Sequence, residues 1–188
     1  ESSPHQNILV SFLVSNPGEV VSLSWLNHAA ALSVVDVLTK MGVKKSAIKW
    51  PNDVYVGERK IAGILTENIV AEKRVRHAVI GIGLNVNQRK FEEYKATSIF
   101  LITGEESNTV SVLHELYDSF YQRITENSTA LLEEVNKKLY KLGENVTFET
   151  NNRIEEYEIC GIHASGNLLV RSTKDIIQLE HHKVKWIH

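Results

Sequence analysis

Cysteine and long apolar runs are scarce in the sequence, and each absence excludes a class of protein. The single cysteine, Cys160, rules out an internal disulfide and is typical of a reducing compartment. No apolar run approaches the roughly 20 residues that a helix needs to cross a bilayer, and no secretory segment is visible. We therefore expect a cytoplasmic protein without a membrane partner.

Positive charge is also in short supply. The chain has 21 Lys and Arg against 23 Asp and Glu, so its formal net charge is -2. A nucleic-acid-binding surface needs an excess of basic residues, and we expect no DNA contact by this segment. The 8 His residues show no spacing typical of a metal site, and we assign no metal-binding residues.

The residues that are present suit a folded domain. Of 188 residues, 43% are hydrophobic and 23% are charged, which allows one ordinary domain or one domain with a small appendage. The pattern predicts an α+β fold: a mixed β-sheet with flanking helices, followed by a small C-terminal β-barrel. We place the larger domain at 1–142 and the barrel at 143–188.

The first elements predict a strand-helix-strand unit. Ile8 to Val14 is an apolar run typical of a buried strand, and Asn16-Pro17-Gly18 predicts a turn. A helix follows and stops at Gly42, and 43–50 returns as a strand. The helix is indicated by the spacing of Leu23, Leu26, Ala30, Val34 and Val37, with Ser22 or Ser24 as its N-cap.

Two more helices and a set of short strands are expected in the second half of the chain. The first helix is indicated by Leu113, Leu116, Phe120 and Ile124. The second follows Ser128, turns Leu132, Val135 and Leu139 inward, and ends at Gly143. Beyond it, short alternating runs predict five barrel strands, at 146–148, 157–162, 168–170, 176–179 and 184–187.

The most distinctive stretch spans residues 49–67. It opens with Lys-Trp-Pro-Asn-Asp at 49–53, where Pro-Asn-Asp favours a tight bend. Two strands joined by a short turn are predicted next, from Val54 to Val56 and from Lys60 to Glu67. Taken alone, Lys60 beside a hairpin turn is most often a solvated charge, and Asn52-Asp53 is most often a plain Asx-turn.

A second distinctive stretch is the predicted strand at 79–87. Because alternate residues of a strand share a face, Ile80, Ile82, Leu84 and Val86 form a core face. The opposite face carries Gly81, Gly83, Asn85 and Asn87. This second face is bare backbone followed by two amides, on which a flat ligand could lie. The glycines could equally accommodate a packed neighbour.

Together these stretches resemble the biotin protein ligase family, whose members join biotin to a lysine of a carrier protein. Three motifs match in order: Lys-Trp-Pro-Asn-Asp at 49–53, Arg-Lys-Ile-Ala-Gly-Ile-Leu at 59–65 and Ile-Gly-Ile-Gly-Leu-Asn at 80–85. The resemblance extends more loosely through 96–99 to the C-terminus. It implies a class II synthetase-like catalytic domain, here incomplete, and an SH3-like C-terminal barrel.

The resemblance implies ATP-dependent chemistry in two steps. The biotin carboxylate attacks the α-phosphate of ATP, giving biotinyl-5'-AMP and pyrophosphate, and a lysine of the biotin carboxyl carrier protein then takes the biotinyl group. Two anions meet in the first step, so the site needs fixed cations more than a base. The family match, rather than the residues alone, favours Lys60 over Lys49 as the catalytic cation between carboxylate and phosphate.

The resemblance also implies the ligand-binding residues. Biotin is expected to contact Lys60, Gly63, Leu65, Gly81 and Gly83, with Leu65 as an apolar wall. ATP is expected to contact Lys49, Asn52, Asp53 and Asn85. Asn85 would read the adenine edge, and Asn52 and Asp53 would order the turn and help to hold the nucleotide or its Mg²⁺. A homodimer is left open.

Two parts of the family pattern are missing. Relatives carry a Gly-Arg-Gly-rich loop and a Thr-Asn-type segment upstream of the first strand, and neither precedes Ile8 here. We therefore expect a portion of a longer ligase, weak or inactive by itself, with an active parent. The alternatives are a ligase for another acyl group such as lipoate, and a non-catalytic biotin-responsive regulator that has no need of Lys60.

Overall fold

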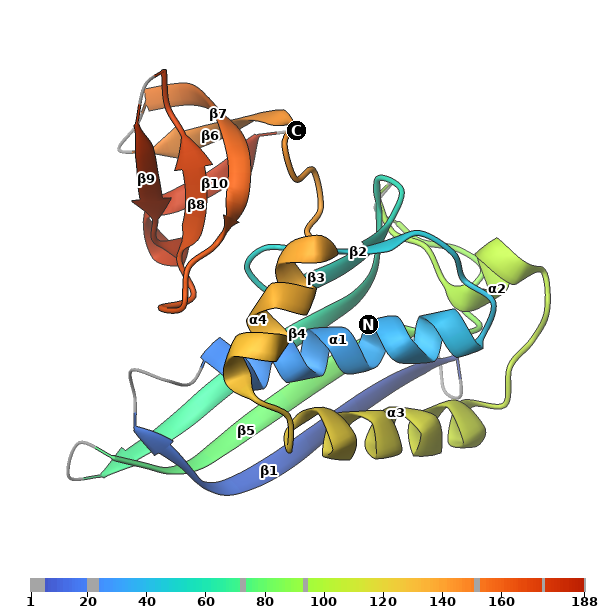
Figure 1. Ribbon diagram of the computed structural model, residues 1–188. Coiled ribbons are helices and arrows are strands. Elements are labelled where there is room, and N and C mark those ends of the chain that lie inside the picture. The colour runs from blue at the N-terminus through green and yellow to red at the C-terminus, as the bar shows by residue number, and fades with distance from the viewer. Residues whose placement is uncertain are drawn as a thin grey trace.

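Two five-stranded sheets and a layer of helices make up the fold, which we describe from a computed structural model (Figure 1). The structure describes residues 6–19, 24–71, 74–92, 95–150, 153–173 and 175–187. The first sheet has the strand order β1-β5-β4-β3-β2. Its strands are β1 (Asn7–Glu19), β2 (Ser46–Lys49), β3 (Asp53–Val56), β4 (Arg59–Ala71) and β5 (Arg74–Asn85).

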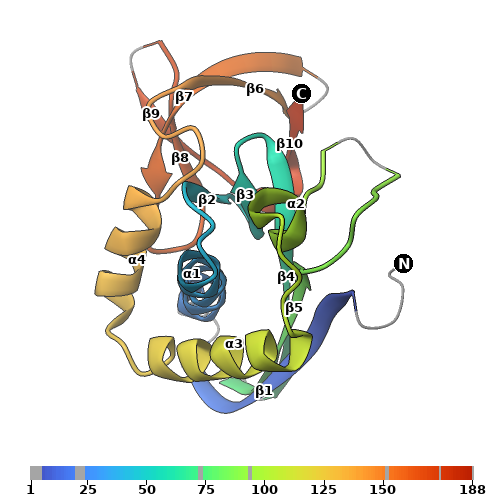
Figure 2. The same ribbon diagram turned by 90° about the vertical axis from the view of Figure 1, so that its right-hand side faces the viewer.

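The helices lie on one face of this sheet. They are α1 (Ser24–Lys40), the short α2 (Ile99–Thr103), α3 (Thr109–Arg123) and α4 (Ser128–Lys137). Figure 2 looks along α1, which lies between the sheet on one side and α3 and α4 on the others. Contact on several sides explains why α1 is buried around most of its circumference and why alanines occupy positions 29–31. In the described ranges no helix covers the opposite face, where Leu9 and Leu65 are exposed.

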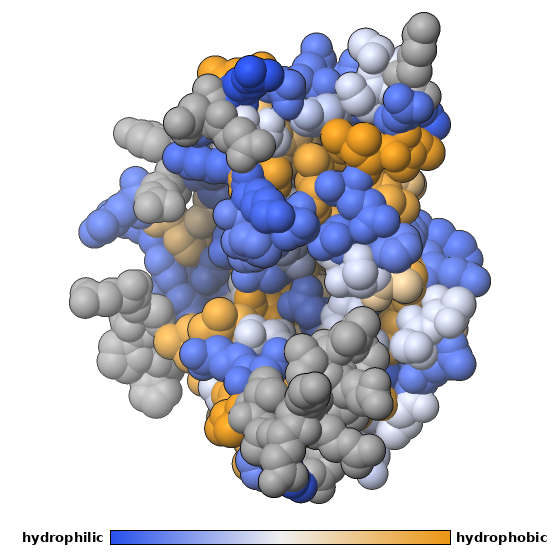
Figure 3. Space-filling model, turned by 90° about the vertical axis from the view of Figure 1, so that its left-hand side faces the viewer, coloured by the Kyte–Doolittle hydropathy of each residue, from blue (hydrophilic) through white to orange (hydrophobic). Residues whose placement is uncertain are grey.

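The second sheet has the order β10-β6-β7-β8-β9 and comes entirely from the C-terminal part of the chain. Its strands confirm the five predicted runs: β6 (Asn145–Thr150), β7 (Arg153–Ile162), β8 (Leu168–Arg171), β9 (Ile176–Leu179) and β10 (Val184–Ile187), with a 3-10 turn, η2 (His181–Lys183), before the last. In the described part of the chain no strand pairing joins β9 to β10. Figure 3 shows hydrophobic surface patches in the upper half, the level of this sheet. Ile154 of β7 and Ile176 of β9 are exposed.

The predicted hairpin and core face in the motif region are confirmed. β3 and β4 are joined by the two residues Gly57 and Glu58, with Gly57 at φ 59°. On β5 and just beyond it, the four predicted core residues are buried: Ile80, Ile82, Leu84 and Val86. Local periodicity was sufficient here because each strand buries only one of its faces.

The expected mixed sheet is wrong in its strand directions. All strand pairs of both sheets are antiparallel in the described ranges, and the parallel pairings are isolated bridges, Ile48 with Leu139 and Lys60 with Ala96. The physical reason is that β2, β3, β4 and β5 follow one another through short connections, which force neighbouring strands to run in opposite directions.

Several predicted boundaries are also corrected. β1 continues through the expected turn at 16–18 to Glu19, with an irregular register against β5 between Ser15 and Gly18. The strand predicted at 43–50 is limited to β2 (Ser46–Lys49), and α4 ends at Lys137 rather than Gly143. Leu139 is buried beyond the helix. Ser24 is the first residue of α1, while the other cap candidate, Ser22, and Leu23 lie outside the described residues.

Candidate functional site

Five strands of the first sheet place one residue each in a continuous row. Lys49 on β2 pairs with Asp53 on β3, and Asp53 pairs with Gly63 on β4. Gly63 in turn pairs with Gly83 on β5, and Gly83 pairs with Leu9 on β1. Directly opposed residues of an antiparallel sheet project to the same face. The three sequence motifs therefore meet on one surface, on the side of the sheet away from α1.

A groove of about 420 Å³ lies over the middle of this row. Its floor is backbone at the glycines, and Leu9 and Leu65 stand beside it with 79% and 58% of their surface exposed. In the next row, Gly81 lies between Leu65 and Ser11. The residues around the groove are Leu9, Val10, Ser11, Asn52, Asp53, Lys60, Gly63, Ile64, Leu65, Gly81, Ile82 and Gly83.

Lys60 reaches this groove because Gly63 has no side chain. The Lys60 ammonium lies 2.6 Å from Asp53 Oδ1. A Cβ on Gly63 would come within 2.9 Å of the Lys60 Nζ and 3.3 Å of the Asp53 carboxylate. By contrast, a Cβ on Gly81 would make ordinary contacts, with Leu65 O nearest at 3.6 Å. A glycine at position 63 therefore leaves room for the Lys60–Asp53 ion pair.

The backbone of Lys60 is fixed from outside the hairpin. Its N–H donates to Lys95 O at 2.7 Å, and its carbonyl accepts from Thr97 N–H at 2.8 Å. Residues 95–97 therefore run beside the start of β4 and add an outer pairing to it. With its main chain held on both sides, Lys60 has mainly side-chain freedom with which to meet an anion.

The bend after Lys49 is tied to β4 by Asn52. The Asn52 side-chain amide donates to Ile64 O at 2.7 Å, and the Ile64 N–H donates to Asn52 O at 2.8 Å. On the other side, Asn27 of α1 donates to Pro51 O at 2.8 Å. These bonds account for the Pro-Asn-Asp bend and place Asp53 opposite Gly63. Asn52 is thus both a residue of the groove and its structural anchor.

Lys49 is enclosed rather than open to the groove. It is 5% exposed, its ammonium lies 3.3 Å from the Tyr55 hydroxyl, and it sits over the rings of Tyr55 and Trp186 at 4.6 and 4.8 Å from their centroids. Burial lowers the pKa of Lys49 to about 8, with the positive charges of Lys95, Lys60 and Lys141 adding to the effect and Asp53 opposing it.

Two predicted site residues, Lys49 and Asn85, do not line the groove. Asn85 makes a contact elsewhere. Its amide nitrogen donates to Thr97 O at 2.9 Å, and the side chain is half-buried beyond the glycine rows. Asn85 therefore connects β5 to the segment that holds Lys60. The other eight predicted residues lie together: Lys60, Gly63, Leu65, Gly81, Gly83, Asn52 and Asp53 around the groove, and Lys49 at the end of its row.

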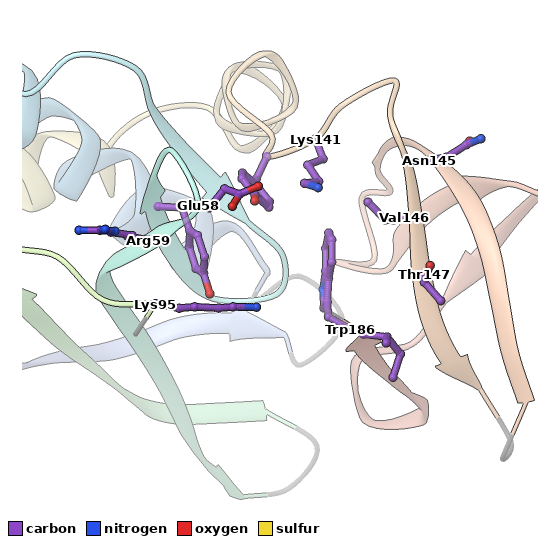
Figure 4. Close-up of a pocket in the computed structure, with 11 residues that line it drawn as sticks. Glu58, Arg59, Lys95, Lys141, Asn145, Val146, Thr147 and Trp186 are labelled. Atoms are coloured by element: carbon purple, nitrogen blue, oxygen red, sulfur yellow. The ribbon is translucent and has the colours of Figure 1, made fainter. Parts of the chain in front are cut away.

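A second hollow, of about 520 Å³, lies between the two sheets on the other side of the β3–β4 hairpin. Figure 4 shows Lys95 and Trp186 facing one another across it, with Lys141 at its edge. No sequence pattern indicated this hollow, because Tyr140 and Trp186 reach it from segments distant in the chain from Tyr55 and Arg59. The lining residues are Tyr55, Glu58, Arg59, Lys95, Tyr140, Lys141, Asn145, Val146, Thr147, Trp186 and Ile187.

Leu9 and Ser11 were also missed as groove residues. The sequence signal that could have identified them is the alternation of exposed and inward-facing residues along β1. Leu9 and Leu13 are exposed, whereas Phe12 packs against the helices and stacks on Phe120 at 4.7 Å. In the described ranges, no helix is long and apolar enough to cross a membrane, and no three His, Cys, Asp or Glu side chains are placed to hold a metal ion.

Comparisons with known proteins agree with this geometry. The model of the Biotin/lipoate A/B protein ligase family matches residues 2–85. The bifunctional ligase/repressor BirA of Bacillus subtilis is 32% identical over 161 residues, covering 80% of this chain and 49% of that protein. The biotin--[acetyl-CoA-carboxylase] ligase of Mycobacterium tuberculosis is 42% identical over 84 residues, covering 43% and 30%. The chain thus spans about half the length, or less, of these relatives.

Solved structures extend the likeness over both sheets. The biotin protein ligase of Aquifex aeolicus superposes with a TM-score of 0.81 at 26% identity, covering 97% of this chain and 82% of that one. The same protein in complex with biotin and ATP gives 0.80, with 78% of its chain covered. The match includes the strands that carry Lys60 and the glycines, as well as the C-terminal sheet. The chain belongs to the biotin protein ligase family.

Proposed function

We propose that this protein is a biotin–protein ligase: it activates biotin with ATP to biotinyl-5'-AMP and transfers the biotinyl group to a lysine of a biotin carboxyl carrier protein. The observation that carries the proposal is the side-chain-free groove over Gly63, Gly81 and Gly83 with the Lys60 ammonium at its end. Relatives named as biotin ligases, and one structure named as a complex with biotin and ATP, support biotin as the acyl group.

The chemistry follows from placing an anion beside Lys60. Biotin lies along the groove, with its carboxylate beside Lys60 and its apolar parts against Leu65 and the glycine backbone. One carboxylate oxygen attacks the α-phosphate of ATP, the bond to the β-phosphate breaks, and pyrophosphate leaves. The Lys60 ammonium either breaks its ion pair with Asp53 or keeps it while also contacting the reactants. In both cases it offsets the negative charge that develops between carboxylate and phosphate. The incoming lysine amine then attacks the acyl carbon, and AMP leaves with the bonding electron pair.

The nucleotide would extend from Lys60 towards Lys49, Asn52, Asp53 and Asn85. A single carboxylate beside phosphate oxygens suits Mg²⁺, which keeps several waters and takes few protein ligands. Asp53 is the carboxylate in the groove that could provide this contact. When bound, the ion would draw charge from the phosphates, while Asp53 also orients Lys60.

The remaining assignments belong to the same proposal. Residues 1–142 would form the catalytic domain, and 143–188 would form a small SH3-like barrel from the C-terminal sheet. The partner would be the carrier-protein domain, with homodimer formation open. ATP and the reduced state suited to a single cysteine favour the cytoplasm. We propose no DNA contact for this segment, since its charge is slightly negative.

The test, made on the full-length protein, is isotope exchange between pyrophosphate and ATP that depends on biotin, followed by transfer of biotin to a carrier domain. Exchange that starts on adding biotin, and not on adding lipoate, is expected. Biotin-independent exchange, or exchange with lipoate alone, would contradict the assignment. A Lys60→Ala variant separates a ligase from a binding protein, because biotin-responsive binding without ligation would survive the loss of the ammonium.

A further inference from the structure

The C-terminal sheet touches the Lys49–Asp53 motif directly, through two indole groups. Trp186 of β10 donates its ring N–H to the carbonyl of Trp50 at 3.0 Å. Trp50 donates its own ring N–H to the carbonyl of Gly166, in the connection between β7 and β8, at 2.8 Å. Residues more than a hundred positions apart in the chain are thus held together by hydrogen bonds at one bend.

The same Trp186 ring lies against the ammonium of Lys49. The distance from Nζ to the ring centroid is 4.8 Å, within the range of a cation–π contact, and Tyr55 faces the amine from β3 at 4.6 Å. Trp186 is itself held in place by packing on Phe148 at 4.7 Å, a residue of the C-terminal core. Its position therefore follows from the second sheet, whereas Lys49 belongs to the first.

We propose that Trp186 is a positioning residue for Lys49: the C-terminal sheet closes over this lysine through the indole ring and so sets where the ammonium stands and how readily it carries its charge. The inference rests on the proposed ligase function, in which Lys49 supports the negative charge of the nucleotide. It assigns a role to the second sheet at the site itself.

Two opposite effects of the ring on Lys49 can be separated. The ring excludes water, and burial is the largest cause of the lowered pKa of Lys49. The ring face attracts the cation, and this attraction raises the pKa of Lys49. In the described ranges, the other charged or titratable groups that bear on Lys49 include Asp53, Tyr55, Lys60, Lys95, Tyr140 and Lys141. None of these is changed by a substitution at position 186.

The test is a direct titration of the Lys49 amine by NMR after ¹³C-dimethylation of lysines, with the resonance assigned by Lys49→Arg. In the unsubstituted protein the pKa is expected near 8. In Trp186→Leu, water reaches the amine, and the pKa should rise towards 10.5, its value without burial. Trp186→Phe keeps an aromatic cover and should leave the pKa near that of the parent. Trp25→Leu, which removes an indole elsewhere, is the matched control.

Fluorinated tryptophan at position 186 provides a second measurement that preserves the shape of the ring. Fluorine weakens the attraction of the ring face for a cation, so the pKa of Lys49 should fall stepwise with the number of fluorines. This series decides the matter if Trp186→Leu does not fold. A pKa unchanged in folded Trp186→Leu, or unchanged across the fluorine series, overturns the proposal.

Ligand affinity shows whether the contact matters for function. Between pH 7 and pH 9.5 the unsubstituted protein should lose about tenfold in affinity for biotinyl-5'-AMP, the value of one charge-assisted hydrogen bond. Trp186→Leu should lose clearly less, because its Lys49 stays charged. If biotinyl-5'-AMP does not bind the parent, the proposed function fails. If it binds with the same pH dependence in both proteins, only the role of Trp186 fails.

Discussion

A missing side chain decides where the Lys60 ammonium, the proposed catalytic cation, lies. Gly63 is required neither by a left-handed backbone nor by a turn, since it sits inside β4 opposite Asp53. What it provides is space, because a methyl group there would meet the Lys60 ammonium at 2.9 Å. The motif Lys-Ile-Ala-Gly thus has a local explanation: the lysine folds back over the residue three positions later, where a side chain would require the ammonium to move.

Replacing Lys60 by alanine should reduce biotin-dependent pyrophosphate exchange by about 10²- to 10³-fold, the typical cost of removing one fixed donor that faces a developing negative charge. The free energy of unfolding should barely change, because the Lys60–Asp53 pair is partly exposed and such pairs contribute little. Lys90→Ala, at an exposed position away from the groove, is the control. Exchange at the parent rate in Lys60→Ala would remove Lys60 from the mechanism.

The two glycines of the groove should respond differently to alanine. In Gly63→Ala the methyl group displaces the Lys60 ammonium, and we expect about a tenfold or greater loss in turnover with a smaller change in KM for biotin. In Gly81→Ala the methyl group fits against Leu65 but occupies the groove, so mainly KM for biotin should rise. Steady-state kinetics of both variants distinguish these effects; identical changes in the two would contradict the separate roles.

At the scale of elements, the sequence predicted what is local and missed what depends on partners elsewhere. The β3–β4 hairpin and the two faces of β5 follow from period-2 alternation, which each strand displays by itself. The continuation of β1 through Asn16-Pro17-Gly18 does not, because its hydrogen-bond partners are on β5, 74–75. The end of α4 was likewise misjudged: Lys138 and Tyr140 leave the helix to hydrogen-bond with Ile48 of β2.

Prediction of the candidate site had the same limit: local features were found, and contacts between distant segments were missed. Gly63, Gly81 and Gly83 were singled out from spacing and from the resemblance, and they do share one surface. The enclosure of Lys49 by Trp186 and Tyr140 was not foreseeable, since both residues come from beyond α4 and no periodicity links them to β2. Asn85 was expected on the ligand surface, yet its amide is used to hold residue 97.

Three helices are joined by one arginine, and this predicts where the helical layer is weakest. Arg123 at the end of α3 donates to Asp36 of α1 at 2.8 Å and to Glu134 of α4 at 2.6 Å, with 13% of its side chain exposed. The two carboxylates raise the pKa of Arg123 further above its usual value. Without the guanidinium, three carboxylates would be left close together in a partly buried site, because Glu126 also pairs with Arg123, at 3.1 Å.

Arg123→Met should therefore lower the free energy of unfolding by about 2 kcal/mol, less than the loss for a fully buried pair because water reaches all three carboxylates. Urea unfolding at pH 7 measures the change. Lys40→Met is the matched control: it also breaks a pair between α1 and α3, with Glu115, but both side chains are exposed, and no measurable change is expected. Equal effects of the two substitutions would contradict the argument from burial.

At the scale of the whole molecule, the two sheets are joined at α1 as well as at the Trp50 bend. The Ser24 hydroxyl, at the start of α1, donates to Ala164 O at 3.1 Å in the connection between β7 and β8. One turn later His28 lies against a cleft lined by residues of α1, α4 and this connection. His28 is 6% exposed, and burial lowers its pKa to about 4. The junction thus contains an imidazole that is neutral at pH 7.

Acid should weaken the whole fold through this histidine. An unfolded chain binds a proton at His28 near pH 6.5, whereas the folded chain resists protonation down to about pH 4. Stability is therefore fully present above pH 6.5 and declines as the pH falls from 6.5 to 4, by about 3 kcal/mol from this residue. Below pH 4 both states carry the proton and this loss stops growing.

Urea unfolding measured at pH 7.5 and at pH 4.5 tests this. The parent should lose stability between the two conditions, and His28→Gln, which cannot take up the proton, should lose markedly less while starting from a lower value at pH 7.5. His181→Gln changes an exposed histidine near the C-terminal strand and should follow the parent at both pH values. If His28→Gln loses as much stability on acidification as the parent does, then carboxylates elsewhere, and not the buried imidazole at the junction of the two sheets, set the acid limit of the fold.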